Sequence, residues 1–486
     1  MSKRKERITP FTKQCFVTLG VSLNMAAAGL VMGFTTGLLQ QLRAPDSSIP
    51  VDDSSGSWIA ALPGLTLVAG NFIAPSIIAR YGRKSANLIS IIPLIIGFIQ
   101  GLCMGMATSL GSALIGEYSS PNNRGAFLMT ISASIAISVL AVHTMGSYLS
   151  WKITALICGI IALVDLVIVF LSPESPSWLA EQGRYEECRK IYRWLRGNNE
   201  EEELKRMIEA SIIIKEAQAD INVPKSIVKK LKLNLVYFST TVQKKEFIKP
   251  IIIMIHIYTI AQWSGVNLMV PYAIDLFHKV VGRDVNIPLN IIALDSHRII
   301  ANILAVYIIK KMKRRTMLLA TTTLNIFALI TTAGYTYAKE NHVLPFDSPI
   351  IGTLLIHIMM FAIATGTLPL CFIIAGEIFP LEFRSLAGGI SVLFYSTHLF
   401  VSVKTIPNFL ATLGIHGTYL LYSIILAYCL IVSAYFLPET KDRTLQDIED
   451  EFRGRKLTIE ELKSVQSLTS WKNLNHDRRC STPVVV

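Results

Sequence analysis

Charged residues are scarce in this chain of 486 residues, at 16%, whereas hydrophobic residues make up 51%. The seven cysteines are scattered and show neither metal-ligand spacing nor an extracellular disulfide framework. The sequence also lacks an Asn-x-Ser/Thr acceptor for N-glycosylation. These scarcities argue against a disulfide-stabilised secreted protein. We expect no metal, no cofactor and no catalytic residues, and therefore no enzyme.

Long apolar runs dominate what is there, and the mean hydropathy is +0.47. Several runs approach 20 residues, the length that crosses a bilayer as a helix. The net charge of +12 comes from basic residues beside these runs, which indicates membrane topology and not nucleic-acid binding. The sequence thus predicts an all-α, multi-pass membrane protein. We place the spans at about 14–39, 58–79, 85–116 (two short helices), 126–149, 151–171, 247–277, 287–309, 316–337, 349–374, 385–411 and 416–436.

A repeated motif divides these spans into two related halves. Gly-Glu, six residues and Arg occur at Glu117 and Arg124, and again 260 residues later at Glu377 and Arg384. A basic turn precedes each copy of the motif. A Pro-Glu pair follows each copy, with Glu174 after the first and Glu439 after the second. A long-period repeat in an apolar chain is typical of transporters built from two similar halves.

The repeat spacing points to a shortened segment in the first half. Arg83 precedes Glu117 by 34 residues, whereas Arg314 precedes Glu377 by 63. The 32 residues of 85–116 carry no charge and must cross the bilayer twice if both ends lie inside. Two helices of about 16 residues would each be only about 24 Å long. We therefore predict that helices 3 and 4 are truncated.

Composition shifts give the domain boundaries. We predict an N-terminal transmembrane half over 1–173 and a charged cytoplasmic helical linker over 174–246. A C-terminal transmembrane half then covers 247–437, and a polar cytoplasmic tail covers 438–486, with a helix near 444–464. Basic residues precede the first span, and no cleavable signal is apparent. Both termini are therefore expected in the cytoplasm, and the oligomeric state is left open.

Eight motifs in order carry a family resemblance over about 14–450. They are Gly56-Ser57-Trp58, Tyr81-Gly82-Arg83-Lys84, Gly116-Glu117 with Arg124-Gly125, Pro173-Glu174-Ser175-Pro176-Ser177-Trp178-Leu179, Trp194-Leu195-Arg196-Gly197, Gln262-Trp263-Ser264-Gly265-Val266-Asn267, Gly376-Glu377-Ile378-Phe379-Pro380 and Pro438-Glu439-Thr440-Lys441. In these the chain resembles the sugar porter branch of the major facilitator superfamily, and within it the insect trehalose-type facilitators. The resemblance implies the major facilitator fold, with two pseudo-symmetric six-helix halves.

Charged residues at the cytoplasmic helix ends form a candidate gate. Ion pairs there could hold the halves together and break when the inside opens, and a network of weak pairs suits such a switch. Simple helix-end charges that obey the positive-inside rule are the alternative. The gate residues are Arg83, Glu117, Arg124, Glu174, Arg315, Glu377, Arg384 and Glu439.

The resemblance also implies a sugar site at the centre of the membrane. Gln262 and Asn267 match family sugar ligands, Tyr272 matches a gating tyrosine, and Phe372 falls where a stacking Trp usually stands. Gly265 permits the broken span that brings the two amides together. Amides bonded between helices, and packing for Phe372, are the alternative interpretations.

Several family ligands are substituted. Arg298 stands where an Asn ligand is usual, one turn beyond Asp295, and a self-compensating intrahelical pair is the alternative to a substrate role. The family's proton-coupling Asp of span 1 corresponds to Thr35 here, and a hydroxyl does not titrate near neutral pH.

The resulting prediction is a plasma-membrane uniporter for a sugar such as trehalose or a hexose. Two alternatives stay open. One is a non-transporting sugar sensor or degenerate paralogue, which the substituted ligands favour. The other is a proton-coupled transporter of another small polar solute, for which Asp295 or Asp165 would be the titrating group.

Overall fold

The computed structural model describes residues 9–44, 47, 49–96, 100–197, 200–219, 239, 241–282, 285–344, 348–379, 384–441, 443, 448 and 451–454. Within these ranges it contains helices and turns and no strand. Ten of its helical segments are long and apolar enough to cross a membrane. The predicted all-α membrane protein is therefore confirmed.

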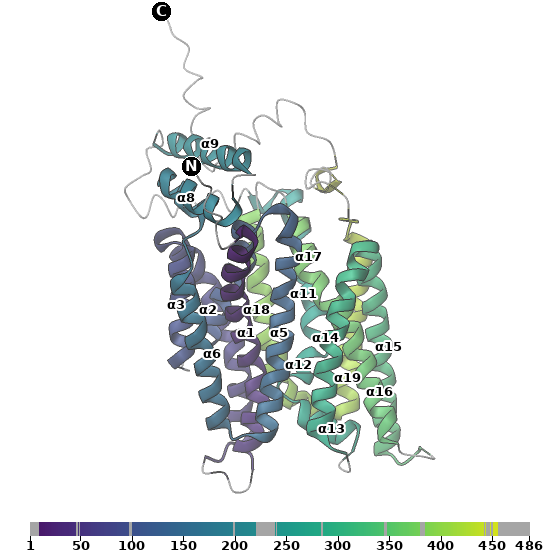
Figure 1. Cartoon of the computed structure of the whole chain (residues 1–486). Coiled ribbons are helices and arrows are strands. Elements are labelled where there is room, and N and C mark those ends of the chain that lie inside the picture. Colours follow the sequence, from purple (N-terminus) through teal and green to yellow (C-terminus); the bar gives the residue numbers. More distant parts are fainter. Residues whose placement is uncertain are drawn as a thin grey trace, which may run out of the picture.

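Six helices form the first bundle (Figure 1). α1 packs against α5, α2 against α4, and α3 against α6. Side-chain caps start several of them: the Thr9 and Asp52 oxygens each accept a backbone N–H three residues on, at the starts of α1 and α2. The bounds are α1 Pro10–Leu42, α2 Asp53–Tyr81, α3 Arg83–Ile96, α4 Gln100–Tyr118, α5 Pro121–Tyr148 and α6 Trp151–Leu171.

The segment that we predicted to be short contains α3 and α4. They have 14 and 19 residues, which at 1.5 Å per residue gives about 21 Å and about 28 Å. Two helices thus lie between Arg83 and Tyr118, as expected, and α4 approaches the thickness of a bilayer core. Residues 97–99 lie outside the described residues. The truncation relative to the second half stays a prediction.

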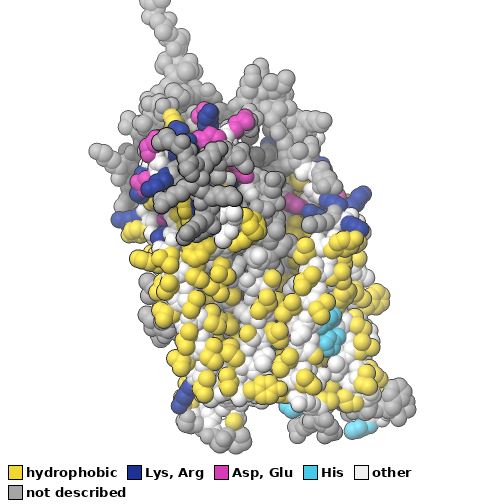
Figure 2. Space-filling view, in the orientation of Figure 1, with side chains coloured by type: hydrophobic (Ala, Val, Ile, Leu, Met, Phe, Trp, Pro, Cys, Tyr) yellow, Lys and Arg dark blue, Asp and Glu magenta, His cyan; other side chains and the backbone are white. Residues whose placement is uncertain are grey.

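Three short helices lie across one end of the first bundle, which we call the linker end (Figure 1). They are α7 Pro176–Glu181, α8 Tyr185–Arg196 and α9 Glu201–Ala219. The Gln14 side chain of α1 donates to the Leu195 carbonyl at 3.1 Å, so α8 is tied to α1. Charged side chains gather at this end, whereas hydrophobic ones cover the sides of the helices (Figure 2). Such a surface suits a lipid environment with water at the linker end.

The second bundle contains the remaining helices. Its bounds are α11 Lys245–Trp263, α12 Val266–Met269, α13 Ala273–Val280, α14 Ile287–Lys311, α15 Arg314–Glu340, α16 Pro349–Ala362, the π-helical turn η1 Ile363–Thr367, α17 Leu368–Ile378, α18 Arg384–Thr412 and α19 Gly414–Phe436. α15 packs against α19, and α11 packs against both α18 and α19. Most of the helix predicted near 444–464 lies outside the described residues.

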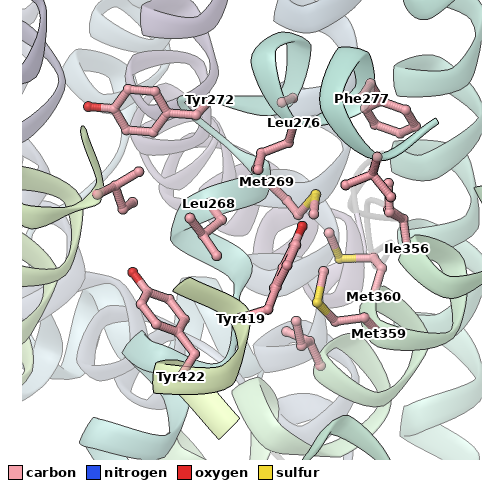
Figure 3. Packing of buried hydrophobic residues seen from close by; sticks show 14 of the residues in the cluster. Leu268, Met269, Tyr272, Leu276, Phe277, Ile356, Met359, Met360, Tyr419 and Tyr422 are labelled. Atoms are coloured by element: carbon pink, nitrogen blue, oxygen red, sulfur yellow. The ribbon is translucent and has the colours of Figure 1, made fainter. Parts of the chain in front are cut away.

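The seventh predicted span, 247–277, is broken. Gly265 adopts φ +103°, a left-handed conformation that a side chain would strain, and it separates α11 from α12. Beyond the break, Leu268, Met269 and Tyr272 pack into a buried cluster with Met359 and Tyr419 (Figure 3). The break is therefore fixed by close packing with α16 and α19, at the place where the sequence predicted it.

Candidate functional site

The break in the seventh span brings two amides together. Asn267 Nδ2 donates to Gln262 Oε1 at 2.8 Å, to the Gln262 carbonyl at 2.9 Å, and to Ser402 Oγ of α18 at 2.6 Å. Both side chains are buried. Gln262 Nε2 lies next to the Tyr395 hydroxyl but makes no hydrogen bond of good geometry among the described residues, so this buried amide N–H can take a further acceptor. A hydroxyl-rich solute would supply such an acceptor.

The two predicted aromatic residues occupy different environments. Tyr272 is buried at the start of α13 in the apolar cluster of Figure 3. Phe372 of α17 is 52% exposed, and its ring meets Tyr395 edge-on at 5.4 Å between centroids. Tyr395 in turn lies next to the Gln262 side chain. Phe372 is therefore connected to the amide pair through one intervening side chain, that of Tyr395. Tyr272, in contrast, contributes to packing.

Arg298 lies in a separate charged cluster. Its Nη1 is 3.8 Å from Asp295 Oδ1, and the other carboxylate oxygen is 2.5 Å from Nδ1 of His143. His143 belongs to α5, so this contact joins the two bundles. His143 was not among the predicted site residues, because its partner lies 152 residues away. Arg298 thus forms an intrahelical pair that is also part of a contact between the halves, and its predicted substrate role stays a prediction.

The described polar contacts between the two bundles lie in the middle of the helices or near the end marked by α13, which we call the α13 end. Arg43 at the end of α1 pairs with Asp275 of α13 at 3.1 Å. Lys404 Nζ of α18 donates to Ser57 Oγ of α2 at 2.5 Å and lies 4.3 Å from the Trp58 ring centroid. The bundles are therefore joined at the α13 end.

The first copy of the repeated motif is a compact ion-pair network at the linker end. Arg83 Nε is 2.7 Å from Glu117 Oε1, and Arg83 Nη1 is 3.4 Å from Glu181 of α7. Glu174 accepts the backbone N–H groups of Arg83 at 3.0 Å and Lys84 at 2.9 Å. Burial raises the pKa of Glu117 above its ordinary value of 4.5, and the positive charge of Arg83 opposes that shift. All these contacts lie on the first half and its linker.

The second copy repeats the arrangement on the second half. Glu439 accepts the backbone N–H groups of Arg314 at 2.8 Å and Arg315 at 3.2 Å. The guanidinium that faces Glu377 belongs to Arg314, at 3.6 Å, whereas the Arg315 side chain donates to the Ala434 carbonyl. Arg314 is thus the counterpart of Arg83 and was absent from the predicted gate.

Two gate residues fall outside this description. The side chains of Arg124 and Arg384 lie outside the described residues, although both backbones are placed near the starts of α5 and α18. The remaining six gate residues contact partners within their own half. The predicted gating role stays a prediction.

A bundle of this kind, with two repeated halves and a broken helix at their interface, has the architecture of a membrane transporter. The family model described as "Sugar (and other) transporter" matches residues 94–452. The chain therefore belongs to this family of membrane transporters, and the resemblance read from its motifs is confirmed.

Relatives and solved structures agree with this assignment. The chain is 26% identical to the facilitated trehalose transporter Tret1 of Drosophila yakuba over 94% of its own length, but it spans only 54% of that protein. It is 26% identical to Tret1 of Apis mellifera ligustica, covering 91% of this chain and 89% of the relative. The proton:xylose symporter XylE superposes with a TM-score of 0.69 at 18% identity, covering 91% of this chain and all of that one. The last comparison confirms the major facilitator fold.

Proposed function

We propose that this chain transports a sugar, trehalose or a hexose, across the plasma membrane by facilitated diffusion. The observation that carries the proposal is the amide pair Gln262 and Asn267, held at a helix break beside the first half, which α1 contacts at Val270. Hydrogen-bonding groups at a broken helix between two halves are what a midplane solute site requires. The curated relatives named as trehalose transporters support the choice of solute.

Alternating access accounts for the arrangement of contacts between the halves. The basic residues beside the spans favour a cytoplasmic linker end, with both termini on that side. The contacts at the α13 end then close the outer side, and the motif networks at the linker end stay within each half. This arrangement fits a state in which the outer side is closed, because the polar contacts between the halves among the described residues lie away from the linker end.

The residue at the family's proton-coupling position supports uniport. The Thr35 hydroxyl donates to the Met32 carbonyl of its own helix at 2.8 Å. It does not titrate near neutral pH, and its hydrogen-bond partner among the described residues is this uncharged carbonyl. Sugar would therefore move down its own gradient.

Uptake of radiolabelled trehalose and glucose into proteoliposomes containing the purified full chain tests this function. We expect saturable uptake that an ionophore for protons does not change. Asn267→Ala should lower uptake at low sugar concentration by about tenfold, the effect of about 1.4 kcal/mol. Asn408→Ala, an exposed amide on α18, is the matched control.

The alternative of a non-transporting sugar sensor predicts a different result. A sensor would bind sugar, measured by calorimetry on the purified protein, yet show no uptake and no counterflow. Binding without flux would overturn the transport proposal. Uptake abolished by the proton ionophore would overturn uniport alone.

A further inference from the structure

A buried charged cluster joins the two halves within the membrane-spanning helices, nearer to the α13 end than to the linker end. His143 of α5 and Asp295 of α14 lie 2.5 Å apart, and their side chains are only 2% and 5% exposed. Arg298, one turn further along α14, faces the same carboxylate at 3.8 Å. We call His143, Asp295 and Arg298 the inter-half cluster. Ionisable groups buried between membrane-spanning helices are energetically costly, and their presence there points to a function.

Thr36 of α1 determines where the protons of this cluster are. Its hydroxyl contacts the Val270 carbonyl at the end of α12 and His143 Nε2 at 3.2 Å. A carbonyl only accepts, so the single hydroxyl proton is donated to Val270. The Thr36 oxygen can then only accept from His143, which requires a proton on Nε2.

The other ring nitrogen completes the proton count. His143 Nδ1 faces Asp295, so either Nδ1 donates to an ionised carboxylate or a protonated carboxyl donates to Nδ1. In both cases the pair holds one proton more than a neutral imidazole and a carboxylate would hold. With Arg298 the inter-half cluster then carries one net positive charge.

Separation of the halves removes the reason for that proton. Asp295 stays with Arg298 because both are on α14, so that pair remains neutral. His143 leaves with Thr36 on the first half, without its carboxylate. A lone imidazolium inside the membrane is strongly disfavoured, so the ring releases its extra proton.

We propose that His143 and Asp295 form a proton-binding site that exists only while the halves are closed at the α13 end. Closing the outer side then takes up one proton, and opening it releases one. The inference rests on the proposed alternation between two states. It requires no proton gradient, because the proton acts on the equilibrium between the states, and it is compatible with uniport.

Other titratable groups near the cluster have their own partners. His297, on another face of α14, lies 3.1 Å from His357 of α16. On α1 and α13, Arg43 and Asp275 pair with each other. The turn η1, which also packs on α14, has no titratable side chain. Within the described residues, the charged contacts of His143 and Asp295 are those of the inter-half cluster.

The test measures the closed and open states directly. Spin labels on cysteines placed at Ser150 and Asn341, exposed positions at the α13 ends of the two bundles, report their separation in a full chain lacking native cysteines. The distance distribution in lipid nanodiscs is recorded between pH 5.5 and 8.5 without sugar. Linkage to one proton predicts that the closed-to-open ratio falls as pH rises, by up to about tenfold per pH unit.

His143→Gln and Asp295→Asn each remove one side chain of the proposed proton site, and we expect either to flatten the profile to less than a twofold change. Thr36→Val removes the hydroxyl that accepts from Nε2 and donates to Val270, so it should weaken the closed state, move the midpoint of the closed-to-open transition to lower pH and keep the slope. His297→Gln, on the same helix as Asp295 but outside the cluster, is the matched control and should keep the wild-type profile.

Two results would overturn the inference. One is a wild-type ratio that changes less than twofold over this pH range, which needs no variant to fold. The other is a wild-type profile in His143→Gln. Because no sugar is added, a protein that transports neither trehalose nor glucose but shows the pH-linked distance disproves the proposed function and leaves the proton site standing.

Discussion

The two copies of the linker-end motif share a backbone pattern and differ in how they are enclosed. In both copies one carboxylate accepts three backbone N–H groups, two from the basic turn and one from a residue just after the glutamate. Glu174 accepts those of Arg83, Lys84 and Ser175. Glu439 does the same for the corresponding turn of the second half, at Arg314, Arg315 and Lys441. This shared part is dictated by the repeated Pro-Glu and basic-turn motifs.

The ion pairs beside this pattern differ. The Arg83–Glu117 pair is 2.7 Å long and both side chains are about one-sixth exposed, whereas the Arg314–Glu377 pair is 3.6 Å long and Glu377 is 31% exposed. The linker explains the difference, because Glu181 and Arg196 of α7 and α8 add contacts to the first network only. A desolvated pair gains more than an exposed one. The first copy is therefore the firmer of the two.

Removing the shared carboxylates, Glu174 and Glu439, should lower the stability most. The loss should be equal in the two copies of the motif. Glu174→Ala and Glu439→Ala each leave three backbone N–H groups without a charged acceptor, and each should lower the free energy of unfolding by about 3 kcal/mol. Thermal unfolding of the purified protein in detergent measures this. Glu186→Ala, an exposed carboxylate on α8, is the control. Losses that differ between the copies by more than about 2 kcal/mol would contradict equal backbone roles.

Removing the arginines should destabilise the first copy of the motif more than the second. Arg83→Leu leaves the buried Glu117 without its counterion and should cost about 2–3 kcal/mol, while Arg314→Leu removes a longer, more exposed pair and should cost about 1 kcal/mol or less. The same unfolding measurement applies, with Arg80→Leu as a control at an exposed position. An equal cost at the two sites would show that the linker adds nothing to the first pair.

Exchanging the turn residues tests the backbone of each copy. Gly82 has φ +94°, and an added Cβ would collide with Glu174, whereas the corresponding Lys313 has φ −66°. Gly82→Ala should therefore cost about 1–2 kcal/mol, and Lys313→Gly no more than about 1 kcal/mol, through chain entropy alone. A tolerated alanine at position 82 would mean that the two turns are interchangeable.

The smallest expected effect lies in the linker itself. Arg193 holds the pKa of Glu201 below its ordinary value of 4.5 through a hydrogen-bonded pair between α8 and α9. A lowered carboxyl pKa stabilises the fold above pH 4.5, and this contribution is lost as the pH falls through the lowered pKa. Glu201→Gln should lower the unfolding temperature slightly at pH 7 and leave it unchanged at pH 3. A difference that persists at pH 3 would rule out a charge effect.

Local sequence signals predicted the parts of the site that depend on one helix or one motif. The repeat located both networks, and the resemblance located the broken span with Gln262 and Asn267. Counting along the repeat also aligns Arg83 with Arg314, yet the predicted gate included Arg315, because two adjacent arginines look alike until the turn fixes which one faces Glu377.

Contacts between distant segments could not be predicted. The partners Ser402 and His143 lie 135 and 152 residues from Asn267 and Asp295. No local pattern specifies which faces of α5 and α14, or of α12 and α18, meet. Which helix faces meet is determined by the packing of whole helices. A single sequence, without covariation between positions, does not allow these contacts to be predicted.

The break at Gly265 changes what motion costs in this helix. A membrane-spanning helix normally satisfies its own backbone, and in lipid any opened carbonyl lacks a partner. Here the Gln262 carbonyl accepts from the Asn267 amide, and the Ser264 carbonyl accepts from Asn325 of α15 at 2.9 Å. Side-chain amides can exchange one acceptor for another. Bending at this point therefore requires the exchange of hydrogen-bond partners and not the loss of a bond, which keeps the barrier to movement low.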